Sequence, residues 1–178
     1  MSTKQILLSG FGGQGILFAG KMLAYKGLTE DKQVSWLPSY GPEMRGGTAS
    51  CSVIISDEAV GSPIVSKPDI LVAMNLPSLD RFEESVVPGG MIFVDSSLVE
   101  RDVARKDVTV FRVPATRLAG ENGFSTLANM ILVGKILKEL GEFDREVLSK
   151  TLTKVISAKR ADMIDVNMEA MQLGADCQ

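Results

Sequence analysis

The sequence predicts an α/β fold: a three-layer, doubly wound and mainly parallel sheet of the Rossmann-like type, in a single domain. Three observations predict it. The chain has 178 residues, which is the size of one domain. A glycine-rich turn at 10–15 lies between a short apolar run and a run of small residues with helical spacing. Further apolar runs then alternate with helical patterns, as in parallel sheets that are covered on both faces.

The predicted strands are short apolar runs that end at turn-forming residues. The first strand is predicted at 4–9, and the glycine-rich turn leads from it into a helix over 15–27 with small residues on its inner face. Further strands are predicted at 34–38, 48–55, 70–74, 91–94 and 108–113, with a short helix at 79–87. The strand at 48–55 alternates apolar and polar residues, which predicts one less apolar face that solvent or a partner could cover.

The C-terminal part is predicted to be helical from about residue 125. A helix over 125–140 ends at Gly141, because glycine commonly terminates helices. Asp144 is expected to cap a second helix that runs through 153, and a last helix is predicted at 154–171.

Composition narrows the class of protein. The chain is 45% hydrophobic and 23% charged, with a net charge of −3 and a pI of about 5.1, so neither a nucleic-acid nor a membrane partner is expected. No signal peptide is recognised, and no apolar run approaches the ~20 residues of a membrane span. The cytoplasm is therefore the expected compartment.

The residue types expected for catalysis or metal binding are scarce. Histidine, the commonest general base and metal ligand, is absent from the sequence. The two cysteines, Cys51 and Cys177, lie far apart, which argues against an iron–sulfur or zinc site in this chain. Cys51 is expected to be a buried, inert thiol. We predict no catalytic residue and no metal ligand.

The glycine-rich turn is the first candidate binding site, formed by Gly10, Gly12, Gly13, Gln14 and Gly15. Backbone N–H groups of such a turn, together with a helix N-terminus, can face an anionic ligand. Three interpretations stay open here: a tight structural turn, a phosphate site, or close approach by another protein chain. NAD fits poorly, because the second strand ends at 36–39 without the acidic residue that holds the ribose.

The loop over 39–47 is the second candidate. Tyr40, Glu43 and Arg45 can each make a directed polar contact, Gly46 and Gly47 permit a close backbone approach, and Ser39 begins the loop. We expect this loop to neighbour the glycine-rich turn, because both follow the carboxyl ends of the first two strands. An ordinary rigid loop with a Glu43–Arg45 ion pair is the alternative. Asp95 and Ser96, at another strand end, could bind a ligand or cap a helix or turn.

Four motifs together resemble the gamma subunit of the 2-oxoacid:ferredoxin oxidoreductases. They are GFGGQG at 10–15, PSYGPEMRGGTASCSVIIS at 38–56, PDILVAMN at 68–75 and NMILVGKI at 129–136. The resemblance extends over about residues 4–140, and the first two motifs in combination are the specific part of it. It implies a doubly wound α/β domain that completes a larger assembly.

The resemblance also implies an activity and partners. Such enzymes decarboxylate a 2-oxoacid oxidatively with thiamine diphosphate, transfer the acyl group to coenzyme A and reduce ferredoxin through 4Fe–4S clusters. It implies that these cofactors lie mainly on alpha and beta subunits and on a ferredoxin-like delta subunit or its equivalent, and that this chain is inactive alone. General likeness slightly favours 2-oxoglutarate over pyruvate, branched-chain and aryl 2-oxoacids.

Within this resemblance the two candidate loops have two possible roles. They could face coenzyme A or thiamine diphosphate, as cofactor-binding residues, or they could form an intersubunit contact only. Two other function classes stay open beside the subunit: a stand-alone dinucleotide-binding oxidoreductase and a non-catalytic interaction module.

Overall fold

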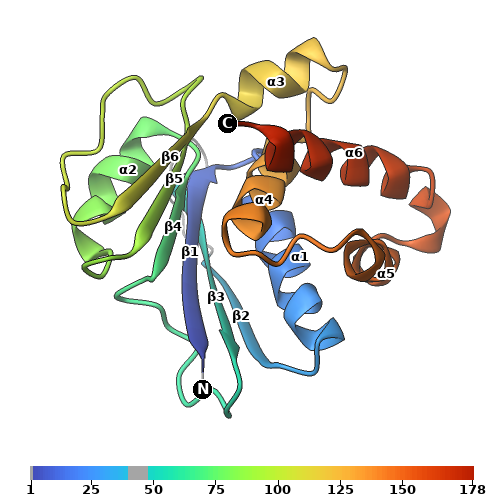
Figure 1. Cartoon of the computed structure of the whole chain (residues 1–178), viewed down its shortest axis with the longest axis horizontal. Helices are drawn as coiled ribbons and strands as arrows, with labels where there is room; N and C mark the ends of the chain where they lie inside the picture. The colour runs from blue at the N-terminus through green and yellow to red at the C-terminus, as the bar shows by residue number, and fades with distance from the viewer. Residues whose placement is uncertain (1, 40–47) are drawn as a thin grey trace.

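Six strands form one sheet in the part of the chain that the computed structural model describes, residues 2–39 and 48–178 (Figure 1). Their order is β2-β3-β1-β4-β5-β6. The strands are β1 (Thr3–Phe11), β2 (Gln33–Ser39), β3 (Thr48–Ser56), β4 (Ile70–Ala73), β5 (Met91–Asp95) and β6 (Thr109–Val113). β1, β4, β5 and β6 run parallel, whereas β3 pairs antiparallel with both β1 and β2. The predicted mainly parallel α/β fold is thus confirmed, with one antiparallel strand.

The helices follow the predicted order but differ at several boundaries. They are α1 (Ile16–Thr29), α2 (Leu76–Phe82), α3 (Ala115–Glu121), α4 (Ala128–Glu139), α5 (Arg145–Val155) and α6 (Met163–Asp176), with single 3-10 turns at Glu83–Ser85 and Ala158–Arg160. The predicted helix at 79–87 begins earlier, because the Asn75 side chain caps α2 by accepting from the Ser78 N–H. α6 begins nine residues later than predicted, after an extended backbone at Ile156 and Ser157. α3 is a separate helix that the sequence pattern does not predict.

Alternate residues of the central strands enter two different cores. Ile6 and Leu8 of β1 face the core beneath α1, α4, α5 and α6, whereas Leu7 faces a smaller core beneath α2. Figure 1 shows this division, with α2 on one side of the sheet and α1, α4, α5 and α6 on the other. The predicted three layers are therefore present, and the C-terminal helices make one of the outer layers thick.

α4 and α6 are in backbone contact at two glycines. A Cβ atom placed on Gly134 would lie 1.8 Å from the Met171 carbonyl oxygen, and one on Gly174 would lie 1.8 Å from that of Ile131. No side chain can occupy such a gap, so these two glycines set the distance between the helices.

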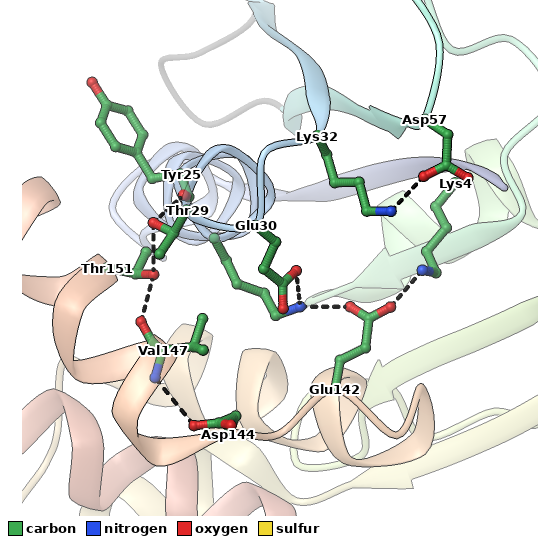
Figure 2. Close-up of polar contacts among 11 residues, drawn as sticks. Lys4, Tyr25, Thr29, Glu30, Lys32, Asp57, Glu142, Asp144, Val147 and Thr151 are labelled. Atoms are coloured by element: carbon green, nitrogen blue, oxygen red, sulfur yellow. Dashed lines mark hydrogen bonds and ion pairs between the residues drawn. The ribbon is translucent and has the colours of Figure 1, made fainter. Parts of the chain in front are cut away.

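A buried ion-pair cluster joins the helical layer to the amino-terminal end of the sheet. Lys26 of α1 is only 1% exposed, and its Nζ lies 2.7 Å from Glu30 and 2.8 Å from Glu142. Lys4 of β1 pairs with the other oxygen of Glu142. Figure 2 shows Lys4, Glu30 and Glu142 turned toward one another, with the Lys32–Asp57 pair beside them.

The cluster has a structural explanation. Burial raises the pKa of Glu142, but the hydrogen bonds from Lys26 and Lys4 outweigh burial and hold that pKa below its ordinary value. These charges satisfy one another, so we assign the cluster to stability and not to ligand binding.

None of the described helices has the length and apolar character needed to cross a bilayer.

Candidate functional site at the carboxyl end of the sheet

The glycine-rich turn lies where the strand order changes direction. The chain goes from β1 through α1 to β2 and β3 on one side of β1, and β4, β5 and β6 follow on the other side. In open α/β sheets the crevice at such a point, outside the carboxyl ends of the strands, is the usual ligand position. In this sheet that position is at the ends of β1 and β4.

Two glycines of the turn adopt conformations that other residues avoid. Gly13 has φ = 90° and Gly15, the N-cap of α1, has φ = 75°. No side chain among the described residues caps the N-terminus of α1, so its first backbone N–H groups are not occupied in that way. An anionic group would fit such a helix end.

Gln14, which is partly buried, makes two hydrogen bonds within the protein. Its Oε1 accepts from the Phe11 N–H at 2.6 Å, and its Nε2 donates to the Met74 carbonyl at 3.1 Å. A Cβ atom on Gly10 would lie 2.6 Å from the Gln14 Oε1, so Gly10 makes room for this side chain. These two predicted site residues therefore join the turn to the end of β4, while Phe11, Gly12 and Gly13 form its exposed tip.

Ser39 lies at the same end of the sheet as the glycine-rich turn. It pairs with Ser50 of β3, and Ser50 pairs with Ser9 of β1. β3 therefore lies between β1 and β2. The loop that begins at Ser39 thus starts one strand further from the glycine-rich turn than it would if β2 were next to β1. The other loop residues, Tyr40, Glu43, Arg45, Gly46 and Gly47, lie outside the described residues.

The position of β3 bears on dinucleotide binding. In the dinucleotide fold the strand after the first helix neighbours β1 and carries the acid that binds the ribose. Here that strand is β2, which ends at Leu37-Pro38-Ser39 and is displaced from β1 by a full strand. The geometry as well as the sequence therefore disfavours NAD at the glycine-rich turn.

Three large apolar side chains are exposed where adjacent strands end. Phe11, at the end of β1, is 40% exposed; Leu76, after β4, is 37% exposed; and Leu98, after β5, is 41% exposed. β1, β4 and β5 are consecutive in the sheet, so these residues follow one another along its carboxyl end. We call them the apolar row. When exposed apolar side chains form a contiguous patch, they mark a protein–protein contact.

Sequence reasoning missed both the apolar row and Asn75. Asn75 is 2% exposed, and its Nδ2 has no hydrogen-bond partner among the described residues. The sequence signal that could have indicated these residues is their position, because each lies at or just after the end of a predicted strand. Glycine and charged residues stand out at strand ends, whereas a single apolar residue there gives no comparable signal of exposure.

Asp95 is a capping residue. It is fully buried, and its carboxylate accepts from the Thr116 N–H and Oγ1 and from the Ser97 N–H. These bonds hold the chain after β5 against the start of α3. Of the two interpretations left open for Asp95, the structure supports the cap.

Cys51 is buried in β3, as predicted. Burial raises the pKa of its thiol to about 12, and the contact with Trp36 offsets this only in part. At pH 8 the thiolate fraction is then roughly a thousandfold below that of a free cysteine. We expect iodoacetamide to alkylate Cys177, which is partly exposed, while Cys51 reacts only after unfolding. Mass spectrometry of the native and urea-unfolded protein measures this, and rapid native labelling of Cys51 would contradict it.

No group of three or more histidine, cysteine or acidic side chains suited to a metal ion occurs within 2–39 and 48–178. The candidate site is thus the carboxyl end of the sheet in a doubly wound α/β domain, where an uncapped helix N-terminus lies beside the apolar row. This chain belongs to the pyruvate ferredoxin/flavodoxin oxidoreductase family, which matches residues 5–177. The resemblance drawn from the four motifs is confirmed.

Two relatives and one solved structure place the chain within the family. It is 40% identical over 174 residues to ketoisovalerate oxidoreductase subunit VorA of Methanothermobacter thermautotrophicus (strain Delta H), covering 97% of this chain but 36% of that protein. It is 38% identical over 152 residues to 2-oxoglutarate synthase subunit KorC of Methanocaldococcus jannaschii, covering 84% of this chain and 81% of that one. The crystal structure of a keto/oxoacid ferredoxin oxidoreductase gamma subunit from Geobacter sulfurreducens superposes with a TM-score of 0.81 at 27% identity, covering 97% and 96% of the two chains.

Proposed function

We propose that this chain is the gamma subunit of a multi-subunit 2-oxoacid:ferredoxin oxidoreductase, and that companion chains carry out bond making and electron transfer. Family membership supports the proposal. So does the match to KorC over most of both chains, together with the likeness to a gamma subunit of known structure. This chain spans about a third of the VorA relative. That partial coverage supports the proposal that the chain works together with other polypeptide segments of a larger assembly.

The observation that carries the proposal is the apolar row beside the glycine-rich turn. Gln14 is hydrogen-bonded within the turn and to the residue that follows β4, so its side chain is held in place by the protein itself. Phe11, Leu76 and Leu98 remain exposed around it. Burying such side chains against another protein is favourable by about 25 cal/mol per Å² of apolar area. We infer that the carboxyl end of the sheet faces the alpha and beta subunits.

Thiamine diphosphate and coenzyme A enter this proposal as groups that the companion chains hold. When bound there, thiamine diphosphate supplies the electron sink for decarboxylation and coenzyme A accepts the acyl group. The uncapped N-terminus of α1 fits an anionic group such as a pyrophosphate. In this chain the exposed tip at 11–13 and the loop 39–47 would orient such a group and exclude water from it.

The contact is tested by changing Phe11 in the assembled complex. We expect Phe11→Asp to weaken association with the alpha and beta subunits about tenfold or more, because a charge would replace a buried aromatic anchor. Leu28→Asp is the matched control: Leu28 is 50% exposed but lies at the opposite end of α1. Co-purification and analytical ultracentrifugation measure assembly. Equal effects of the two variants, or turnover of a 2-oxoacid by the isolated chain, would refute the proposal.

Arg45→Ala separates the two roles left open for the candidate loops. Loss of assembly with unchanged Michaelis constants would assign Arg45 to the contact between subunits. A raised Michaelis constant for coenzyme A in an intact complex would assign it to the ligand.

We propose 2-oxoglutarate as the preferred substrate of the complex. The KorC match, which covers most of both chains, supports this choice, and the match to VorA makes a branched-chain 2-oxoacid the main competitor. Ferredoxin reduction by the purified complex with 2-oxoglutarate, 3-methyl-2-oxobutanoate and pyruvate decides among them. A higher kcat/KM for either competitor would overturn the assignment.

A further inference from the structure

Gln14 is bonded to both backbone groups of Phe11 and so closes the glycine-rich turn. Its backbone N–H donates to the Phe11 carbonyl at 3.2 Å, and its side-chain Oε1 accepts from the Phe11 N–H at 2.6 Å. Gly10 leaves the space for that side chain, and Gly13 turns the backbone with a φ of 90°. Phe11 is 40% exposed and belongs to neither hydrophobic core of the described residues, so the bonds to Gln14 help to set its position.

The other end of the Gln14 side chain is bonded to a fixed point of the sheet. Its Nε2 donates to the Met74 carbonyl at 3.1 Å. Met74 is 2% exposed and directly follows β4, and its own N–H donates to the Ser9 carbonyl of β1 at 2.9 Å. Backbone bonding to β1 therefore holds Met74 in place, and Gln14 adds a link from Met74 to the exposed turn.

Leu76, the second member of the apolar row, lies two residues beyond Met74. It is the first residue of α2 and follows the N-cap residue Asn75, whose side chain caps the helix. The start of α2 is therefore fixed by its own cap. The side chain of Gln14 thus connects the two segments that carry Phe11 and Leu76 at the ends of neighbouring strands.

We propose that Gln14 is a positioning residue of the apolar row, because it holds Phe11 in place relative to Leu76 before the companion chains bind. This inference rests on the subunit contact proposed above and adds to it the residue that prepares the surface. An exposed side chain that is already in place loses less conformational freedom on binding, so preorganisation raises affinity. Gln14 is thus expected to act on association through Phe11 and not through a contact of its own.

The first test follows the Phe11 amide in the isolated full chain by hydrogen exchange in NMR. Gln14→Ala removes the acceptor of the Phe11 N–H, so we expect that amide to exchange about fivefold faster or more. Gln172→Ala is the matched control, since Gln172 is also partly buried and its side chain also makes two hydrogen bonds, to Arg145 and Asp176. Equal exchange of the Phe11 amide in the natural chain and in Gln14→Ala would overturn the proposal.

A double-mutant cycle in the assembled complex tests whether Gln14 acts through Phe11. We expect Gln14→Ala alone to weaken association with the alpha and beta subunits about fivefold, and to change it less than about twofold when Phe11→Ala is already present. Gln14→Met keeps the size of the side chain but removes the amide group, so it should behave like Gln14→Ala. Gln172→Ala should leave association unchanged.

Two results of this cycle would overturn the proposal. If Gln14→Ala weakens association by the same factor with Phe11 and with Phe11→Ala, its effect is independent of Phe11. If Gln14→Met associates like the natural chain, the hydrogen bonds of Gln14 do not matter for the contact. Failure of the subunit contact itself gives a different result, because Phe11→Ala alone would then leave association unchanged and both proposals would fall.

Discussion

Replacing Gly134 by alanine is expected to lower the free energy of unfolding by about 3 kcal/mol or more. The added Cβ would lie 1.8 Å from the Met171 carbonyl oxygen of α6, and the obstacle is backbone and not a movable side-chain end. α4 and α6 would have to separate, which removes packing along both helices. Urea unfolding followed by circular dichroism measures the loss.

Gly120→Ala is the matched control for this effect. Gly120 is also in a helix, α3, but a Cβ there has no neighbour within 4 Å. Alanine is the better helix former by about 1 kcal/mol, so this variant should be unchanged or slightly more stable. If Gly134→Ala behaved like Gly120→Ala, the close contact of α4 with α6 would not exist in solution.

Glu142→Ala is the second change with a large expected effect, about 3 kcal/mol in the free energy of unfolding. It leaves Lys26, which is 1% exposed, with Glu30 as its ion-pair partner among the described residues. A buried charge that loses a partner keeps its desolvation cost. Adding Lys26→Met to this variant should restore part of the lost stability, because the buried charge is then gone.

The exposed Lys150–Glu146 pair provides the control. Lys150→Ala removes a pair that is open to solvent on both sides and should change stability little. A double variant no more stable than Glu142→Ala alone would show that the buried charge of Lys26 is not the cause of the loss.

Acid should remove the contribution of Glu142. Its pKa in the folded protein lies below the ordinary value of 4.5, so its stabilisation is fully present above that value. The stabilisation is lost as the pH falls through the lower, folded pKa. The stability difference between the natural chain and Glu142→Gln should therefore be constant near neutral pH and shrink below about pH 4.

The strands can be predicted from sequence because their signals are local. β1, β4 and β5 are short apolar runs bounded by turn formers, and each lies within two residues of its predicted bounds at either end. Helix boundaries are less predictable where a single side chain decides them. Asn75 starts α2 three residues early through its bond to the Ser78 N–H, and its effect depends on a backbone geometry that the sequence alone does not specify.

The sequence could predict which residues lie in the region of the candidate site, but it could not predict the interactions that each of them makes. Gly13 and Gly15 have the positive φ angles that their glycine spacing indicates. Gln14 is predicted as a ligand contact, and the sequence does not indicate its bond to Met74, 60 residues further along the chain. Likewise, the Asn129 side chain donates to the Gly15 carbonyl only because α4 packs against α1.

The sequence by itself determined the class of fold, the family and the position of the glycine-rich turn. These depend on the periodicity of hydrophobic residues, on turn-forming residues and on the spacing of motifs, which are all properties of short stretches of the chain. Tertiary structure decided that β3 separates β2 from β1, that the apolar row lies along one end of the sheet, and that Gln14 joins the glycine-rich turn to Met74. These features arise from contacts between residues far apart in the chain, where packing and burial, not local preference, select the arrangement.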